Sequence, residues 1–563
     1  MPARIALALL ALLAFAPAAE AKPNILVLMT DDQTLDSMSV MPKTRALIGD
    51  RGATFTRSFA GYPLCCPSRA TLYTGQYAHN HGVLSNMPPS GGYTRLDTSN
   101  WLPLWLQAAG YRTMHVGKFL NGYGRLSPPT VVPPGFNDWH GTVDPSTYNF
   151  LNYTVNENGA LRTYPGFYST DFFAQRAGEL IAAAAPADKP FFMSVAFLAP
   201  HSGGPREPDD PAGHATPAVA PRHANAFAST ALPLPPSFNE ADVSDKPLGM
   251  RQRRPIGVVR AAKIQEGYQQ RLESLLAVDD AVASIVSTLR FVGELDDTLI
   301  LFTSDNGFFH GEHRVPIGKL LVYEPSIRLP LLMRGPGVPA GVAARQLVTN
   351  ADLAPTILDA AGARAGRAQD GRSLLELVAD PGVQWGRELL VESGNPQGLT
   401  TAALRNYRWK YVEHPTGEVE LYDLERDPHE LASLHANAAL AGVRTAMAAR
   451  LRALRTCAGR TCRAKPAVKL VARRRDCRFV GAVRGADADA IERVEFLVRR
   501  RPRGDGVATV ARFRRVGRDA SAPVRRLLRP RGVLPGRRLL LRARVSLDDG
   551  RAVTLDRRLR ACR

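Results

Sequence analysis

Four side chains that carry oxygen ligands each follow an apolar run of the chain; they are Asp31, Asp32, Asp305 and Asn306. Three carboxylates and one amide oxygen form a hard ligand set, which suits Ca²⁺ or Mg²⁺ better than Zn²⁺. Carboxylates brought together at one place would repel one another unless a cation joined them. The sequence therefore predicts a divalent-cation site. The alternative is that Asp31 caps a helix and that residues 305–307 form only a turn.

A cysteine that could take part in chemistry, Cys65, begins the sequence Cys-Cys-Pro-Ser-Arg. Pro67 fits the first turn of a helix, where a missing N–H costs nothing. Cys65 would then lie at the positive end of that helix, where free N–H groups and the nearby Arg69 favour an anion. The alternatives are a buried pair of cysteines before a helix and an Arg69 on the surface.

Polar residues follow apolar runs elsewhere in the chain as well. Lys118 follows the run at 113–116, and His201 follows the run at 191–197. In open α/β sheets, ligands collect at the carboxyl ends of the strands. Because several separate runs deliver polar residues to one edge, the pattern indicates a single site rather than scattered surface residues.

The elements that must position these residues are strands and helices in alternation. Continuous apolar runs at 24–30, 191–197 and 298–303 are typical of strands buried on both faces of a parallel sheet. A helical pattern at 268–289 has its apolar residues on roughly one face. Alternating strands and helices predict an α/β fold with a mainly parallel sheet flanked by helices.

Other parts of the chain have different patterns. Residues 202–260 are rich in Pro, Ala and Gly and predict a long insertion over the site, partly ordered at best. Short strand-like pieces between 388 and 422, followed by a helix at about 438–454, predict a small antiparallel subdomain. After residue 462 the pattern resembles an immunoglobulin-like β-sandwich, with strands predicted at 494–498, 508–513, 539–545 and 553–555.

The net charge of +20 is carried by the end of the chain. Residues 463–563 contain 30 Lys and Arg but only 10 Asp and Glu, and the rest of the chain has equal numbers of the two signs. A basic segment on a neutral body attracts polyanions. We expect it to dock onto an anionic polymer such as a sulfated glycan or a cell-wall polyanion; the alternative is an Arg-rich domain that is merely solvated. No feature predicts a specific nucleic-acid partner.

The first residues have the pattern of a secretory signal peptide. An apolar run ends at a small-x-small site at 19–21, so residues 1–21 are expected to be removed; an uncleaved anchor is the alternative. No later apolar run is long enough to span a bilayer, so no transmembrane segment is expected. The sequence thus predicts a secreted or extracytoplasmic protein.

The six cysteines of the chain fit an oxidising compartment. Cys457 and Cys462 enclose a short loop and could pair. Cys477 and Cys562 bracket the last segment and could pair across it. The spacing alone proves neither disulfide.

Motifs spread over about residues 23–455 carry a family resemblance; they lie at 31–33, 42–48, 65–75, 79–81, 293–295, 303–307, 316–319, 323–324, 421–424 and 427–430. Together they resemble the formylglycine-dependent sulfatases of the alkaline phosphatase superfamily, and most of all the N-acetylglucosamine-6-sulfatase branch. The resemblance implies a catalytic domain at 22–362 and a C-terminal sulfatase subdomain at 363–455. The Arg-rich β domain at 463–563 lies outside it.

The resemblance also implies a mechanism. A formylglycine-generating enzyme would convert Cys65 to formylglycine (3-oxoalanine), whose aldehyde hydrates to a geminal diol. One hydroxyl attacks sulfur and expels the alcohol, and the second allows sulfate to leave as the aldehyde re-forms. The cation, Ca²⁺ or alternatively Mg²⁺, would be held by residue 65 and by Asp31, Asp32, Asp305 and Asn306.

By the same resemblance, Arg69 and Lys118 steady the formylglycine. Lys319 and His201 face the sulfate and the leaving oxygen, and His201 could protonate the leaving alcohol; the alternatives are a solvated lysine and a loop histidine. His310 and His313 are candidates for helping to deprotonate the diol; alternatively they are substrate contacts or surface residues.

One position departs from the family pattern. Many sulfatases carry a His two residues after the lysine of the Gly-Lys motif, and here that position is Leu120. Asn121 is the nearest polar candidate. The base that acts on the diol is therefore not assigned.

The sequence thus predicts a secreted sulfatase that acts on sulfate monoesters. Its substrate would be a sulfated sugar of the N-acetylglucosamine-6-sulfate or glycosaminoglycan type, or an aryl sulfate. A phosphonate or phosphate ester hydrolase of the same superfamily is one alternative. A binding protein whose cysteine is never converted is another.

Overall fold

The computed structural model covers the chain from residue 22 to residue 560 with several gaps. The predicted signal peptide lies outside the described residues, as do Cys477, Cys562 and the strand predicted at 508–513. The described residues are 22–185, 189–379, 381, 387–463, 468–475, 478–485, 491–500, 514–519, 525–528, 538–547 and 552–560.

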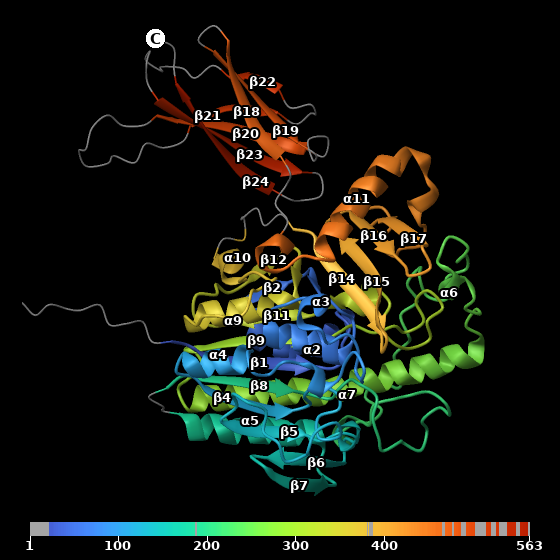
Figure 1. The fold of residues 1–563 in the computed structure, drawn as a ribbon. Coiled ribbons are helices and arrows are strands. Elements are labelled where there is room, and N and C mark those ends of the chain that lie inside the picture. The colour runs from blue at the N-terminus through green and yellow to red at the C-terminus, as the bar shows by residue number, and fades with distance from the viewer. Residues whose placement is uncertain are drawn as a thin grey trace, which may run out of the picture.

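A ten-stranded sheet runs through the main body of the protein (Figure 1). Its order is β12-β2-β11-β9-β1-β8-β4-β5-β6-β7, and the central strands β9, β1, β8, β4 and β5 are parallel. The predicted α/β fold is confirmed, with antiparallel pairs toward both edges. The strands are β1 Asn24–Thr30, β2 Ala53–Phe55, β4 Arg112–Gly117, β5 Asp138–Thr142, β6 Asn152–Glu157, β7 Ala160–Pro165, β8 Phe191–Ala196, β9 Thr298–Ser304, β11 Leu331–Arg334 and β12 Val342–Ala344.

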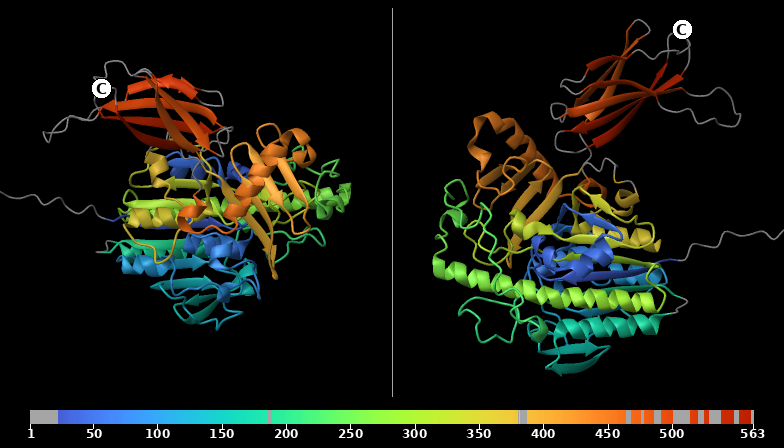
Figure 2. Two further views of the ribbon diagram at one scale, coloured as in Figure 1. Left: turned by 45° about the horizontal axis from the view of Figure 1, so that its top comes forward. Right: turned by 180° about the vertical axis from the view of Figure 1, so that it is seen from behind.

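The alternation of side chains along β1 explains why the sheet is buried on both faces. Ile25, Val27 and Met29 belong to one hydrophobic core, and Leu26 and Leu28 belong to a second. Helices α2, α4 and α9 close the first core, whereas α5 and α7 close the second and lie side by side (Figures 1 and 2). The helices are α2 Cys65–Thr74, α4 Leu102–Ala108, α5 Ser169–Ala184, α7 Val258–Phe291 and α9 Leu353–Ala361, and α7 contains the predicted helix.

A four-stranded antiparallel sheet with a helix on it forms the second unit. Its strands are β14 Leu389–Asn395, β15 Gly398–Arg405, β16 Trp409–Glu413 and β17 Val419–Asp423, and its helix is α11 Ala441–Leu454. Leu390 and Leu421 from the sheet meet Leu451 from α11 in one core, as predicted. Helix α10, Leu375–Ala379, instead shares the core of α9, so a boundary at residue 362 would separate two helices that pack together.

The described C-terminal strands form two antiparallel sheets that stand apart from the main body (Figure 2). One contains β18 Val468–Arg475, β19 Arg478–Gly485 and β22 Arg525–Leu528. The other contains β20 Ile491–Arg500, β21 Arg514–Asp519, β23 Arg538–Leu547 and β24 Ala552–Arg560. Leu470 and Val483 of the first sheet pack against Phe496 and Leu541 of the second, which confirms a sandwich-like arrangement.

Short elements complete the main body. Strands β3 Ser58–Phe59, β10 Arg328–Leu329 and β13 Val348–Thr349 form a small sheet, and the short helices are α1 Pro42–Thr44, α3 Ala78–His81, α6 Leu248–Arg251 and α8 Glu324–Ile327. In the part of the chain that the structure describes, no helix combines the length and apolar character needed to cross a membrane.

The insertion at 202–260 is irregular but fastened to its surroundings, contrary to the expectation of partial order. Gln269 of α7 donates hydrogen bonds to the carbonyls of Ala228 and Thr230. Gln270 of α7 donates to Asp210 at 2.9 Å. The insertion therefore follows the surface of α7 along defined contacts.

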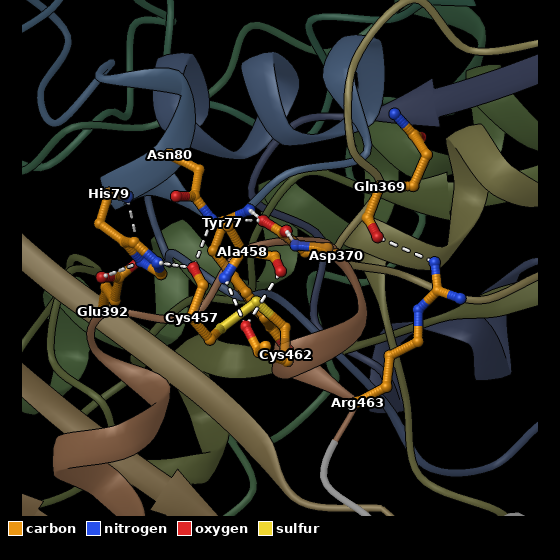
Figure 3. Close-up of a disulfide and its surroundings, with 12 residues drawn as sticks. Tyr77, His79, Asn80, Gln369, Asp370, Glu392, Cys457, Ala458, Cys462 and Arg463 are labelled. Atoms are coloured by element: carbon orange, nitrogen blue, oxygen red, sulfur yellow. Dashed lines mark hydrogen bonds and ion pairs between the residues drawn. A yellow bond between two sulfur atoms is a disulfide. The ribbon is translucent and has the colours of Figure 1, made fainter.

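A disulfide after α11 closes a short loop, and hydrogen bonds join this loop to the segment that follows α2 (Figure 3). Cys457 and Cys462 are bonded, as one of the predicted pairings requires. The carbonyl of Cys457 accepts hydrogen bonds from His79 and Asn80, each at 2.8 Å. Asp370 bridges the two sides, because it accepts from Asn80 and from the Gly459 N–H.

We predict that replacing both cysteines, Cys457→Ser with Cys462→Ser, lowers the free energy of unfolding of the main body by about 2 kcal/mol, the value for so short a loop. The expected readout is a lower Tm, because the acceptor for His79 and Asn80 is no longer held in place. Arg460→Ala in the same loop is the matched control, since Arg460 is exposed. A Tm equal to that of the control would contradict this account.

Candidate active site

The predicted oxygen ligands meet at the carboxyl ends of two neighbouring parallel strands. Asp31 and Asp32 follow β1, Asp305 follows β9, and Thr30 and Ser304 are paired across the two strands. Carboxylate oxygens of the three aspartates lie within 4.8 Å of one another, and all three side chains are buried. The strand-end argument therefore identified a real cluster.

The cluster fits a hard cation. Its donors are carboxylate oxygens, and the Oδ1 atom of Asn306 is buried without a hydrogen-bond partner among the described residues. The Nδ2 of Asn306 donates to Asp32 at 2.6 Å, so this amide already belongs to the cluster. Asp32 has a positive φ of 65°, a conformation that Asp adopts only occasionally. Its carboxylate lies with those of Asp31 and Asp305. These residues fit a divalent cation, and Asp31, Asp32, Asp305 and Asn306 as its ligands stay a prediction.

Helix α2 begins at Cys65 and brings Arg69 into the cluster. Arg69 is buried: its Nε donates to Asp305 at 2.8 Å and one terminal nitrogen donates to Asp31 at 2.9 Å. The remaining terminal nitrogen donates to the carbonyl of Lys118 at 3.0 Å. Arg69 is thus no surface residue, and its ion pairs fix the start of the helix against the strand ends.

The Cys65 thiol faces the predicted catalytic groups. Lys319 Nζ lies 2.8 Å from Cys65 Sγ, and Asp31 Oδ1 lies 3.5 Å from it. His201 offers a ring nitrogen within 4.8 Å of the same sulfur and of Asp31. Lys118 donates a hydrogen bond to Asp31. The structure therefore brings together Cys65, Arg69, Lys118, His201 and Lys319.

The loop that carries Lys319 turns sharply at its two neighbours. Gly318 has a φ of 130° and Leu320 has a φ of 81°, both in the region that side chains usually avoid. Leu320 packs with Tyr62 and Leu64, just before Cys65. This packing holds Lys319 over the start of α2.

The two histidines predicted to contact substrate lie elsewhere. His313 is 1% exposed, bonds to Glu240 at 2.6 Å and stacks on Tyr323. His310 is buried edge-on against Tyr268, and its Nε2 has no partner among the described residues. Neither is among the groups that face Cys65, and their part in substrate binding stays a prediction.

Some residues of the site were not predicted. Arg271 of α7 donates to the carbonyl of Asp32, and its guanidinium lies 3.9 Å from the centre of the Phe308 ring. A charged residue inside the apolar pattern at 268–289 was the available signal. Asn350 donates to the Ser68 hydroxyl at 2.8 Å and steadies α2, and nothing in its sequence context marks it.

A family model described as Sulfatase matches residues 23–363, and one described as N-sulphoglucosamine sulphohydrolase, C-terminal, matches residues 311–457. The chain belongs to the sulfatase family. It is 35% identical over 511 residues to an arylsulfatase of Volvox carteri, which covers 81% of this chain and 78% of the relative. It is 32% identical over 495 residues to N-acetylglucosamine-6-sulfatase of Homo sapiens, covering 78% of this chain and 86% of that one.

A solved structure supports the same fold. It is a protein in complex with its substrate D-glucosamine-2-N,6-O-disulfate, with a TM-score of 0.64 and 24% identity over 77% of this chain and 97% of that one. With the family shown, the chain is a sulfuric ester hydrolase, and the resemblance that the motifs indicated is confirmed.

Two buried carboxylates of this sulfatase site, Asp305 and Asp31, have pKa values shifted in opposite directions. Burial raises the pKa of Asp305 to about 6, and the negative charge of Asp31 adds to the shift in spite of Arg69. Burial also opposes ionisation of Asp31, but Lys118, His201 and Arg69 hold the pKa of that carboxyl well below its usual range. The three carboxylates are thus held close together by the lysines and the arginine around them, and the raised pKa of Asp305 shows that Asp31 and Asp305 repel each other without a cation between them.

We predict that Asn306→Ala weakens divalent-cation binding by at least about tenfold, the loss seen when even outer partners of a metal site are removed. The side chain offers a buried, unpartnered oxygen to the cluster. Metal content of Ca²⁺-loaded protein after dialysis, measured by mass spectrometry, checks this, with Asn152→Ala, at the exposed first residue of β6, as control. Equal metal retention in both variants would exclude Asn306 as a ligand.

Proposed function

We propose that this sulfatase is a secreted enzyme that hydrolyses sulfate monoesters of a sugar, of the N-acetylglucosamine-6-sulfate or glycosaminoglycan type, or of an aryl alcohol. The observation that carries the proposal is the position of Cys65 at the start of α2, between Lys319 and Asp31. The names of the two relatives support the substrate classes.

The nucleophile in this proposal is formylglycine, made from Cys65 by a formylglycine-generating enzyme. Burial raises the pKa of the Cys65 thiol to about 12, so the unmodified residue would be a protonated thiol and a weak nucleophile at neutral pH. The Cys65 sulfur stands where the formylglycine side chain would lie. The hydrated aldehyde supplies one hydroxyl to attack sulfur and a second to release sulfate.

The lysines and the arginine around residue 65 divide into a closed and an open side. The side chains of Arg69 and Lys118 are 3% and 2% exposed and pair with the carboxylates. Lys319 is 13% exposed and pairs with Asp32 beside the sulfur. Lys319 is therefore the cation placed to bind sulfate oxygens as charge develops on them, whereas Arg69 and Lys118 steady residue 65.

His201 lies at the open side, with its side chain 18% exposed. Its Nδ1 donates to the carbonyl of Ser202 at 2.7 Å, because a carbonyl can only accept. Burial lowers the pKa of His201 to about 4, so the resting ring is neutral and its Nε2 is unprotonated. Nε2 can then take up a proton from water at the open side and give it to the leaving alcohol, after which the ring is neutral again.

Asp31, Asp32, Asp305 and Asn306 would hold Ca²⁺ or Mg²⁺ together with residue 65. A divalent cation bound there would withdraw charge from the sulfate and lower the pKa of the attacking hydroxyl. The Cys457–Cys462 disulfide and the leader-like residues 1–21 support secretion.

We predict that the purified protein turns over an aryl sulfate and that the tryptic peptide around Cys65 has the mass of an aldehyde in place of the thiol. Cys65→Ala should abolish turnover. Cys65→Ser should give at most one turnover, because a serine sulfate ester lacks the second hydroxyl. Cys66→Ala at the adjacent buried cysteine is the matched control and should retain activity.

The choice between sulfate and phosphate is decided in the same assay. For 4-nitrophenyl sulfate and 4-nitrophenyl phosphate the expected kcat/KM favours sulfate. A strong preference for phosphate would establish the phosphate or phosphonate ester hydrolase instead. An unmodified thiol in the native secreted protein, together with no turnover, would favour the binding protein.

The Arg-rich β domain is proposed to dock the enzyme onto an anionic polymer. The basis is charge: the excess of 20 positive charges lies in residues 463–563, and the rest is neutral. The hydrophobic core of this domain contains residues of the C-terminal strands alone among the described residues, so a chain that ends at Arg463 keeps the other cores.

We predict that the full chain elutes from immobilised heparin at clearly higher salt than a chain ending at Arg463, because the shortened chain has lost the basic excess. Both forms should hydrolyse a small aryl sulfate at the same rate. Identical elution of the two forms at low and moderate salt would remove the basis for docking.

A further inference from the structure

Tyr148 lies against two groups that flank Cys65, although it belongs to none of the strands that build the site. It ends a short 3-10 helix, Ser146–Tyr148, that follows β5. The amino group of Lys118 lies 4.8 Å from the centre of its ring. The imidazole of His201 lies 5.1 Å from the same centre, tilted by 48°. One aromatic ring thus contacts a cation from the closed side of the site and a histidine from the open side.

Asn121 fixes the far end of this ring. Its side-chain Nδ2 donates to the Tyr148 hydroxyl at 2.7 Å, and its backbone carbonyl accepts from the Tyr93 N–H at 2.8 Å. Asn121 is 8% exposed, and its Oδ1 has no hydrogen-bond partner among the described residues. The backbone of Asn121 is thus held by Tyr93, and its side-chain amide donates to Tyr148.

The side chain of Leu120, which directly precedes Asn121, points away from Tyr148 into the hydrophobic core. It is 2% exposed and belongs to the first hydrophobic core. Within residues 118–121, Lys118 contacts the Tyr148 ring beside its ion pair with Asp31, and Asn121 bonds to the Tyr148 hydroxyl. Two residues of one short segment and His201 from another strand end converge on a single ring.

The chemistry of Tyr148 restricts what it can do. Burial raises the pKa of Tyr148, and the positive charge of Lys118 offsets this only in part, so the side chain is a neutral phenol. A neutral phenol is no base at neutral pH. Its ring face, however, attracts an ammonium group, and its hydroxyl is anchored. Such a side chain can hold Lys118 and His201 in position.

We propose that Tyr148, held by Asn121, is a positioning residue that sets Lys118 and His201 beside residue 65. The proposal rests on the sulfate ester hydrolysis proposed above. If His201 protonates the leaving alcohol, its misplacement slows substrates with poor leaving groups most, because these need the proton. An activated aryl sulfate, whose leaving group is stable as an anion, is affected less.

The experiment compares Tyr148→Phe, Asn121→Ala and the double variant on an activated aryl sulfate and on an alkyl or sugar sulfate. Each single change should lower kcat on the alkyl or sugar sulfate by about tenfold, with a smaller loss on the aryl sulfate and little change in KM. The double variant should be no slower than either single variant, since both remove the same hydrogen bond. Tyr148→Leu, which also removes the ring face, should lose more.

Tyr153→Phe is the matched control, because the Tyr153 hydroxyl is buried without a hydrogen-bond partner among the described residues. It should leave kcat on both substrates unchanged. Additive losses in the double variant, or equal losses on both substrates, would overturn the proposal in favour of a merely structural role. Wild-type turnover in the same assay reports separately on the proposed function.

A binding measurement keeps the positioning role testable without turnover. Inorganic sulfate titrated into the Ca²⁺-loaded protein by calorimetry reports how well the cationic and imidazole groups are placed. Tyr148→Leu should weaken sulfate binding by about tenfold, the range of a lost cation–π contact and its consequences. Unchanged sulfate affinity in Tyr148→Leu, beside an unchanged control, would overturn the proposal even if no ester is hydrolysed.

Discussion

The burial of three carboxylates at the ends of β1 and β9 is the constraint on which the rest of the site depends. Removing charges from water costs several kcal/mol for each ion unless partners offset the loss. Here Arg69, Lys118 and Lys319 lie against Asp31, Asp32 and Asp305. Each of these cations comes from a different segment, so the carboxylates can stay ionised only when all those segments are in place.

This electrostatic requirement also fixes the position of Cys65. Arg69 lies on the second turn of α2, and its two carboxylate contacts clamp the helix so that Cys65, at its first position, faces the strand ends. The Ser68 hydroxyl donates to the carbonyl of Asp305 and accepts from Asn350. The same interactions that neutralise the carboxylates therefore set the start of the helix, and the geometry of residue 65 follows from charge balance.

The sequence predicted those residues of the site that follow a strand or lie in a specific motif. Asp31, Lys118 and Asp305 could be found because each comes directly after an apolar strand, and parallel strands end at one edge. Cys65 could be found because its neighbours form a specific motif. The main sheet and α7 followed from apolar periodicity, whereas the short edge strands β2, β11 and β12 carry too few residues for a pattern.

The rest of the site depends on contacts between segments that carry no local signal. Tyr148 lies in a loop, and only the three-dimensional packing brings it to Lys118 and His201. Arg271 looks like one charged residue on a long helix until its contact with the Asp32 carbonyl is known. The expectation of partial order in residues 202–260 was wrong for a related reason. The composition of the insertion indicates the lack of regular elements. It does not reveal the side chains of α7 that hold the insertion in place.

That insertion is bonded both to Tyr148 and to the loop that leads to Lys319. The Gly204 N–H donates to the carbonyl of Tyr148 at 2.9 Å. Farther along the insertion, the carbonyl of Ser237 accepts a hydrogen bond at 2.7 Å from the N–H of His313, which lies in the loop that leads to Lys319. The open side thus depends on irregular chain, whereas Asp31 and Asp305 depend on the sheet. Changes in the insertion can therefore shift Tyr148 and the loop before Lys319 while the carboxylate cluster and residue 65 keep their places.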